Sequence, residues 1–298
     1  MSGAVLILAG PTCSGKTELA LALAERYDAE IVGADSRQIY RGMPIGTAAP
    51  GAAALARVPH HLIGFLDPYE RYSAARFASD ALAAIAQIHA RGKRALVAGG
   101  TGFYIRALAG DVALCAAYDP ALRERLVREA RLHPPEVLYE WLASRAPARA
   151  AALAAGDTYR VVRALEIALV TEPGANGARA HPSLRSAGIP FVKLVLDVAQ
   201  EELDRRIGAR VEAMLAAGLV DEAERIGPRA VAADAVGYPQ ALAYLRGWLG
   251  EGDLTALLFR ATRRYAKRQR TWFRSEPGVR FVTADTVADA ARELAGWA

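Results

Sequence analysis

The stretch GPTCSGKT at residues 10–17 decides the fold. It matches the pattern GxxxxGK followed by Ser or Thr, which binds phosphate when a strand precedes it and a helix follows it. Both conditions are met, because the apolar run AVLILA ends just before the loop and a helical pattern begins at Lys16. In this setting backbone N–H groups and the helix N-terminus bind a diphosphate or triphosphate, Lys16 adds positive charge, and the Thr17 hydroxyl can ligate Mg²⁺. The loop alone leaves open which molecule carries the phosphate.

Short apolar runs bounded by Gly or Asp recur between longer segments with helical spacing. They predict strands at residues 4–9, 29–35, 94–100, 191–198 and 279–283. Helices are expected at residues 16–26, 73–91, 199–217, 219–226, 238–249 and 253–274, with Ser73 as an N-cap and Gly92 ending the same helix. This alternation is typical of an α/β protein with a P-loop NTPase-like parallel sheet flanked by helices.

Residues 108–188 lack a strand pattern. They are rich in Ala, Arg and Leu, are interrupted by Pro134, Pro135 and Pro147, and end in a loop at 172–188 that is rich in Gly, Pro and Ala. We therefore predict a catalytic core of residues 1–107 and 189–298 that is interrupted by an all-helical insertion domain of residues 108–188.

The composition excludes several other classes of protein. With 298 residues, 53% of them hydrophobic, the chain can bury a large core. Its N-terminus has no basic segment and too short an apolar run to span a bilayer, so we expect no membrane association. The two cysteines, Cys13 and Cys115, lie far apart and predict neither a disulfide framework nor a zinc site. A cytoplasmic protein fits best, with a monomer as the default expectation.

Positive charge is concentrated near the C-terminal end. Residues 259–280 contain eight basic side chains and one acid, Glu276, although the net charge of the whole chain is only +5. The same segment carries Tyr265, Trp272 and Phe273. Such interleaving suits RNA, because rings stack on bases while Lys and Arg contact phosphates. It also fits a solvated helix that turns its rings toward the core.

Several further polar residues follow predicted strands or share a helix face. Asp35 and Asp197 end strands, where parallel sheets bind ligands, so either could hold a metal ion, and Asp35 could also accept a proton from a nucleophile. Thr101 follows two glycines at another strand end. Arg206 and Arg210 are four residues apart, a spacing that can bind a pyrophosphate or simply pair with neighbouring glutamates.

Taken together, the motifs resemble the tRNA dimethylallyltransferase family, also called the tRNA isopentenyltransferase or IPP transferase family. The resemblance rests on GPTCSGKT (10–17), DSRQIYRGMPIGTA (35–48), HHLIGFLDP (60–68), GGTGFY (99–104), RVVRALEI (160–167), RIGARVEAMLAAGL (206–219), VGYPQ (236–240) and TRRYAKRQRTWFR (262–274). It implies transfer of a dimethylallyl group from dimethylallyl diphosphate to the exocyclic amine of the adenosine directly 3′ of the anticodon, with release of diphosphate. Mg²⁺ is the implied cofactor, and the anticodon stem-loop of tRNA is the implied partner.

The resemblance also implies roles for individual residues. The catalytic residues would be Asp35, as the general base, with Lys16 and Thr101. The diphosphate would be bound by Gly10, Pro11, Thr12, Cys13, Ser14, Gly15, Lys16, Thr17, Arg206 and Arg210, and the metal by Thr17. Contacts with tRNA would come from Asp35, Ser36, Arg37, Gln38, Thr101, Arg123, Tyr159, Arg160, Val161, Val162, Arg163, Lys267, Arg268, Gln269, Arg270 and Trp272.

The chain departs from the family pattern at two single positions and in the segment DVALCAAY at 111–118, which is unlike the usual proline-bearing text. Ala49 and Pro239 stand where many members carry a basic residue, and each departure removes a side chain that could contact a phosphate.

Two other functions compete with this one. A P-loop small-molecule or nucleotide kinase would use Asp35 on the acceptor hydroxyl and the two arginines as a lid, but leaves the insertion and the basic helix without a role. An NTP-regulated RNA-binding protein explains the basic helix but not Asp35.

Overall fold

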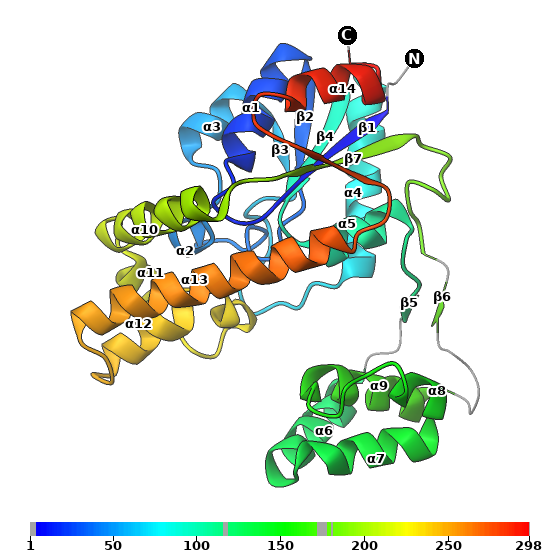
Figure 1. Cartoon of the computed structure of the whole chain (residues 1–298), viewed down its shortest axis with the longest axis vertical. Helices are drawn as coiled ribbons and strands as arrows, with labels where there is room; N and C mark the ends of the chain where they lie inside the picture. Colours follow the sequence, from blue (N-terminus) through cyan, green and yellow to red (C-terminus); the bar gives the residue numbers. More distant parts are fainter. Residues whose placement is uncertain (1–3, 116–118, 172–177, 180, 298) are drawn as a thin grey trace. The chain divides into compact units, whose positions relative to one another are not determined.

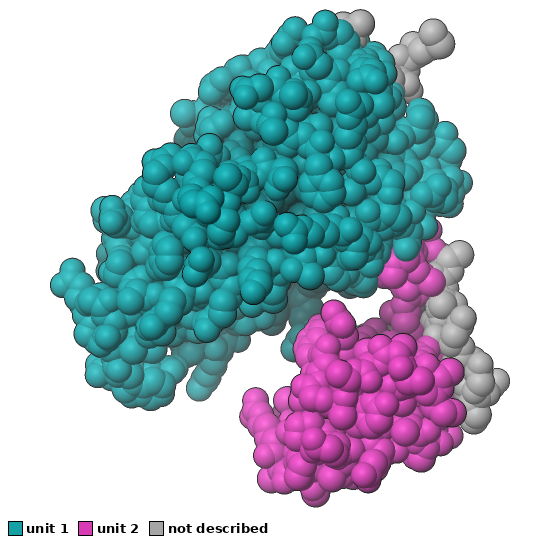
Figure 2. All heavy atoms as spheres, viewed as in Figure 1, with its two compact units in different colours: residues 1–111, 182–298 teal, residues 112–181 magenta. Residues whose placement is uncertain are grey.

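The structure is a computed structural model that describes residues 4–115, 119–171, 178–179 and 181–297. Residues 1–111 and 182–298 form one compact unit, and residues 112–181 form a second (Figure 2). The predicted boundaries lay at 107/108 and 188/189. The first unit extends further because residues up to Ala109 complete a helix and because the Leu184 N–H donates to the Leu108 carbonyl at 2.8 Å.

The core of unit 1 is a parallel sheet, which in the described part of the chain has six strands in the order β3-β2-β4-β1-β7-β8 (Figure 1). The strands are β1 (Val5–Ala9), β2 (Ala29–Gly33), β3 (His60–His61), β4 (Arg94–Gly99), β7 (Phe191–Leu196) and β8 (Val279–Val282). The five predicted strands are confirmed, each trimmed by one or two residues at an end. The short strand β3 was not predicted, because two residues carry no pattern.

The faces of the sheet bury alternate residues of β1. Leu6 and Leu8 point into one hydrophobic cluster, and Val5, Ile7 and Ala9 into another. Because helices cover both faces, β1 is apolar along its whole length, whereas β2, β4 and β7 each include one charged residue.

The described helices of unit 1 comprise six that the spacing predicts and four, at residues 44–47, 52–57, 102–109 and 287–295, that it does not. They are α1 (Lys16–Arg26), α2 (Pro44–Thr47), α3 (Ala52–Arg57), α4 (Ala74–Ala90), α5 (Gly102–Ala109), α10 (Gln200–Ala216), α11 (Leu219–Ile226), α12 (Tyr238–Leu245), α13 (Glu251–Arg274) and α14 (Val287–Ala295), with a 3₁₀ turn, η1 (Val231–Asp234). The predicted N-cap is confirmed, since the Ser73 hydroxyl accepts from the Arg76 N–H at 3.1 Å. None of the described helices has the length and apolar character needed to cross a bilayer.

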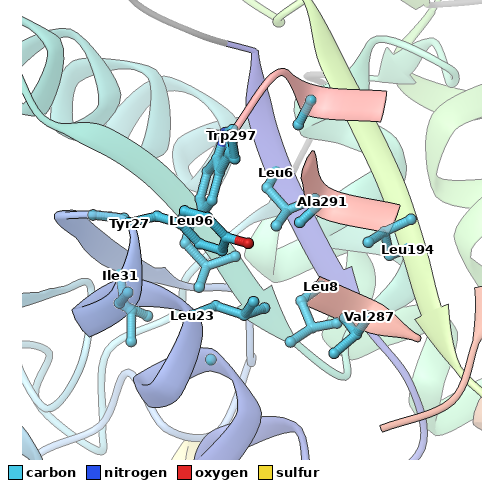
Figure 3. Close-up of a cluster of buried hydrophobic side chains, with 14 of the residues drawn as sticks. Leu6, Leu8, Leu23, Tyr27, Ile31, Leu96, Leu194, Val287, Ala291 and Trp297 are labelled. Carbon is cyan, nitrogen blue, oxygen red and sulfur yellow. The ribbon is translucent and has the colours of Figure 1, made fainter. Parts of the chain in front are cut away.

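Helix α14 closes one face of the sheet together with α1. Trp297, just beyond α14, is fully buried, and its ring lies 5.7 Å from that of Tyr27 in an edge-to-face contact. Its indole N–H donates to the Ala4 carbonyl at 3.0 Å. Figure 3 shows Trp297, Tyr27, Val287 and Leu6 in this cluster. The C-terminal segment is therefore part of the core.

Unit 2 is mainly helical. Its helices are α6 (Pro120–Leu132), α7 (Pro135–Arg145), α8 (Pro147–Ala150) and α9 (Thr158–Val170), and three of them begin at a proline, which suits the first helical position. The prediction that the insertion lacks strands is wrong, because β5 (Leu114–Cys115) and β6 (Ala178–Arg179) pair as a short antiparallel ribbon. Of the predicted loop at 172–188, residues 172–177 and 180 lie outside the described residues.

A cluster of buried ion pairs connects β7 to the segments that follow α5 and α13. The Lys193 ammonium, whose side chain is 2% exposed, lies 2.7 Å from Asp111 and 2.8 Å from Glu276. Arg106 also pairs with Glu276, and Arg185 with Asp111. Buried charges are tolerated only when they are paired in this way.

We therefore expect Lys193→Met to lower the free energy of unfolding by about 3 kcal/mol, because the buried Glu276 carboxylate and the partly buried Asp111 carboxylate each lose one of their two cations. Lys93→Met is the matched control, since Lys93 pairs with Asp28 at the surface and its loss should matter little. Urea unfolding followed by circular dichroism measures both. Equal effects of the two substitutions would contradict the importance of the buried cluster.

Candidate active site

The loop between β1 and α1 has a backbone suited to binding an anion. Gly15 immediately precedes α1 with a φ of +90°, and Cys13 has a φ of +63°, so the loop turns sharply into the helix. The first N–H groups of a helix have no partner within it, and the helix dipole places partial positive charge there. Backbone donors therefore converge at the start of α1.

Lys16 provides a cation within this loop. Its ammonium donates to the Pro11 carbonyl at 2.6 Å. The pKa of Lys16 is lowered to about 8, chiefly by burial; Asp35 opposes this shift and Arg210 adds to it. An anion bound beside Lys16 would favour the charged form and raise this pKa.

Two arginines of α10 contact the same loop. Arg206 donates to the Ser14 carbonyl at 3.1 Å and pairs with Glu202 at 2.6 Å. Arg210 donates to the Thr12 hydroxyl at 2.9 Å. Both alternatives considered for these arginines thus have a basis in the structure, since Arg206 meets a neighbouring glutamate as well as the loop.

The segment after β2 meets the segment after β4. Asp35 accepts the Arg37 N–H at 2.9 Å, and the Ser36 N–H donates to the Thr101 hydroxyl oxygen at 2.9 Å. The Arg37 side chain pairs with Asp234 at 2.8 Å. The predicted residues Asp35, Ser36 and Thr101 therefore lie together at the carboxyl edge of the sheet.

Gln269 of α13 joins two of these strand-end loops. Its side-chain oxygen accepts the Thr12 N–H at 2.8 Å, and its side-chain nitrogen donates to the Gly100 carbonyl at 2.8 Å. Only 6% of Gln269 is exposed. The amide of Gln269 is thus bonded to the backbone at both ends. Gln269 also borders the ligand cavity, and its predicted contact with tRNA stays a prediction.

A cavity of about 440 Å³ unites these groups. Its polar lining includes Lys16, Thr17, Asp35, Gln38, Arg206 and Arg210. Its apolar lining includes Ile31, Ala49, Ala54 and Ile63. A ligand that carries both an anionic and a small apolar group matches this mixture, and the volume is typical of small-molecule sites.

A family model described as IPP transferase matches residues 38–276. The chain belongs to the IPP transferase family. A tRNA dimethylallyltransferase of Geobacter sulfurreducens is 42% identical over 286 residues, which cover 93% of this chain and 91% of that protein. One of Anaeromyxobacter sp. (strain K) is 47% identical over 283 residues, which cover 93% of this chain and 92% of that protein. The resemblance predicted from the motifs is confirmed.

Solved structures agree with this membership. The full-length tRNA isopentenylpyrophosphate transferase of Bacillus halodurans matches with a TM-score of 0.71 and 33% identity, covering 99% of this chain and 97% of its own. A eukaryotic dimethylallyltransferase acting on tRNA matches with a TM-score of 0.77 and 26% identity, covering 99% of this chain and 77% of its own. The predicted P-loop fold is therefore confirmed.

The donor set around the loop fits Mg²⁺ held jointly with a ligand. Among the described residues, no group of three or more His, Cys, Asp or Glu side chains could hold a metal ion by itself. The Thr17 hydroxyl lines the cavity, as does Asp35. Mg²⁺ commonly takes one or two protein oxygens and completes its shell with phosphate oxygens and water. Asp197, the alternative ligand, has a side chain that is 61% exposed and lies 3.9 Å from Arg270.

The residues of unit 2 that were predicted to bind tRNA divide between its surface and its core. Tyr159 is 72% exposed, and the side chain of Arg160 is 64% exposed. Val161 and Val162 are 1% and 3% exposed and belong to the hydrophobic cluster of this unit, so their predicted RNA contacts are wrong. The physical reason is helical geometry, because consecutive residues of α9 face different sides.

Two arginines of unit 2 are held by a buried carboxylate. Arg123 and Arg163 lie 2.9 and 2.8 Å from Glu166, which is fully buried. The Arg123 guanidinium also lies over the Tyr159 ring, 5.4 Å from its centre. Their charge is thus partly neutralised inside the unit.

The predicted RNA contacts of α13 also divide. Lys267 and Arg268 are exposed. Arg270 donates to the Gln200 side chain at 2.6 Å. Trp272 packs against α5, where a Cβ added to Gly102 would meet its ring at 2.1 Å, and Arg106 lies over it at 4.3 Å. These contacts agree with the alternative in which the ring faces the protein; the contact of Trp272 with tRNA stays a prediction.

Two features of the site were not identified from the sequence. Thr47 lines the cavity, and Glu222 holds the turn that carries Thr47. Of the two single-residue departures from the family, Ala49 lines the cavity, whereas Pro239 is exposed in the first turn of α12. No local pattern distinguishes these residues, because their neighbours come from distant parts of the chain.

We expect Gln269→Leu to weaken binding of inorganic pyrophosphate about tenfold, because the Thr12 N–H and the Gly100 carbonyl lose their shared partner. Gln87→Leu, at an exposed position of α4, is the matched control. Isothermal titration calorimetry with pyrophosphate and Mg²⁺ measures both variants. Wild-type affinity in Gln269→Leu would show that the loop holds its shape without this amide.

Lys16 should make binding of the diphosphate depend on pH. Binding favours the protonated form, and the pKa of Lys16 is about 8 before binding, so affinity should be nearly constant below pH 8 and fall as the pH rises above it. The fall attributable to Lys16 should approach about tenfold per pH unit. Calorimetric titrations at several pH values measure the affinity of the wild type and of Lys16→Met. The variant corrects for protons that the ligand itself gains or loses. Parallel pH profiles of the two proteins would show that Lys16 does not cause the pH dependence.

Proposed function

We propose that this chain transfers a dimethylallyl group from dimethylallyl diphosphate to the exocyclic amine of the adenosine directly 3′ of the tRNA anticodon. The main support for this proposal is that one cavity is lined by the phosphate-binding loop with Lys16, by two arginines of α10 and by Asp35. Relatives that share 42% and 47% of their residues with this chain are named tRNA dimethylallyltransferases.

The leaving diphosphate gains negative charge as its bond to the allylic carbon breaks. The backbone N–H groups at the start of α1, the Lys16 ammonium and the guanidinium groups of Arg206 and Arg210 all lie at this loop. Donors that are already in place stabilise such charge without reorganisation. Mg²⁺, held by the Thr17 hydroxyl and the diphosphate, would add electrostatic stabilisation of the same charge.

The acceptor amine must lose a proton when it forms its new bond. The allylic C–O bond breaks, an N–C bond forms, diphosphate leaves, and one proton of the amine passes to Asp35. A carboxylate within hydrogen-bond reach of the amine can serve as this base. The contact between Ser36 and Thr101 places a second polar group beside the same strand end.

Binding of tRNA would use exposed residues of both units. In unit 1 these are basic side chains of α13 such as Lys267 and Arg268, and in unit 2 they are Tyr159 and Arg160. Cations contact phosphates, and an exposed ring can stack on an unpaired base. The target base leaves its stack to enter the cavity, which costs less in a loop than in a duplex. One chain supplies every residue in this scheme, so a monomer suffices.

The direct test combines purified protein, Mg²⁺, dimethylallyl diphosphate and tRNA that lacks modifications. We expect the mass of the tRNA to increase by one dimethylallyl group, with one diphosphate released for each group transferred. ATP-dependent phosphorylation of an acceptor without any prenyl adduct would instead support the kinase.

A substitution tests the assigned base. Asp35→Asn should reduce turnover by about 100-fold or more, because the amide keeps the acceptor for the Arg37 N–H but cannot take a proton. Binding of tRNA should be largely retained. Asp197→Asn changes the other aspartate at a strand end, which is exposed, and should leave turnover unchanged. Single-turnover rates and filter binding separate the two quantities, and a fully active Asp35→Asn enzyme would remove the assignment.

A further inference from the structure

Glu222 of α11 is a carboxylate without exposed surface. One oxygen accepts the Gly46 N–H at 2.7 Å and the Tyr238 hydroxyl at 2.7 Å, and the other accepts the Ile45 N–H at 3.0 Å. Burial, followed by the bond to Glu222, raises the pKa of Tyr238, so the phenol remains a donor. Three donors thus hold a buried charge, an arrangement that is costly to break.

The group that Glu222 holds is the short helix α2. Gly46 lies so close to Tyr238 that an added Cβ would meet its ring at 2.5 Å. The turn ends at Ala48, whose φ of +48° is unusual for a residue with a side chain. Such a conformation persists only where the surrounding contacts enforce it. Glu222 and Tyr238 supply those contacts.

The end of this turn fixes the side chain of Gln38. The Gln38 amide nitrogen donates to the Thr47 carbonyl at 3.1 Å and to the Ala48 carbonyl at 3.0 Å. Both partners can only accept, so the orientation of the amide is determined by its chemistry. Both amide protons are used in these two bonds. Gln38, which lines the cavity, therefore has only its oxygen to offer a ligand, and that oxygen can only accept.

We propose that Glu222 is a positioning residue for the RNA: it fixes the turn at 44–48, and the turn fixes Gln38 as a hydrogen-bond acceptor for an N–H donor of the base that enters the cavity. This inference rests on the proposed function. A base edge that presents an acceptor at the same place would leave two acceptors facing each other, which is strongly disfavoured. Binding of the diphosphate does not depend on these contacts, because the phosphate-binding loop is held by Gln269 and by α10.

The test is a double-mutant cycle of Glu222→Gln and Gln38→Ala. Glu222→Gln keeps the shape of the side chain but replaces one acceptor oxygen with an NH₂ group, a donor that would face another N–H or hydroxyl donor. We expect each single substitution to lower kcat/KM for tRNA by about 10-fold to 100-fold, with the affinity for dimethylallyl diphosphate unchanged. The double variant should be no worse than Gln38→Ala, because Glu222 acts through Gln38.

Gly46→Ala provides a second route to the same turn if Glu222→Gln folds poorly. The added Cβ would push against Tyr238, so this variant should show the same loss in kcat/KM for tRNA, with its affinity for dimethylallyl diphosphate unchanged. Gly252→Ala is the matched control, because an added Cβ there meets open space on α13.

The outcomes separate this inference from the proposed function. If the wild type transfers the group but the two substitutions have additive effects on kcat/KM, the inference alone is overturned. The same holds if the substitutions lower the affinity for dimethylallyl diphosphate. Absence of transfer by the wild type overturns the proposed function and this inference with it.

Discussion

The amide of Gln269 is the contact on which the candidate site depends. It is 257 residues away from Thr12 in the sequence, yet it bonds that residue of the phosphate-binding loop and the carbonyl of Gly100. The loops concerned follow β1 and β4, which are neighbours in the sheet. One buried side chain therefore sets the spacing between the phosphate-binding loop and the loop that leads to Thr101. Helix α13 must pack correctly before the site has its shape, which couples the C-terminal half of unit 1 to the N-terminal motif.

Local patterns predicted most of the fold, because the physics that fixes it is local. The central strands of the sheet are buried on both faces and are mostly apolar, and the loop at 10–17 joins a strand to a helix as its motif requires. Strands β3, β5 and β6 escaped prediction because each has only two residues. In α9 the motif at 159–163 was treated as one block, although a helix can turn only one side to RNA. Tyr159 lies outside, and Val161 and Val162 lie inside.

The residues that organise the site were harder to identify, since each acts on a distant part of the chain. Gln269 and Glu222 are polar residues within helices, and sequence spacing alone makes such residues equally compatible with a solvated face. What distinguishes them is burial with complete hydrogen bonding: Glu222 meets Gly46 from 176 residues away. A buried polar group without partners would destabilise the fold, so full pairing is what allows these residues to remain inside. That pairing can be recognised only once the strands and helices have been assembled.

The cations at the phosphate-binding loop illustrate why such pairing also matters for binding. Lys16, Arg206 and Arg210 donate to oxygen atoms of the loop itself, namely the carbonyls of Pro11 and Ser14 and the Thr12 hydroxyl. A diphosphate would therefore replace neutral acceptors with anionic ones, so that each cation would form an ion pair with a phosphate oxygen instead of a bond to an uncharged oxygen. The gain in free energy is the difference between the two sets of bonds. Because burial disfavours the charged form of Lys16, an anion beside it raises the pKa of Lys16 and keeps the side chain protonated to higher pH. The loop thus favours ligands of high negative charge over neutral ones without needing any contact specific to the group that the phosphate carries.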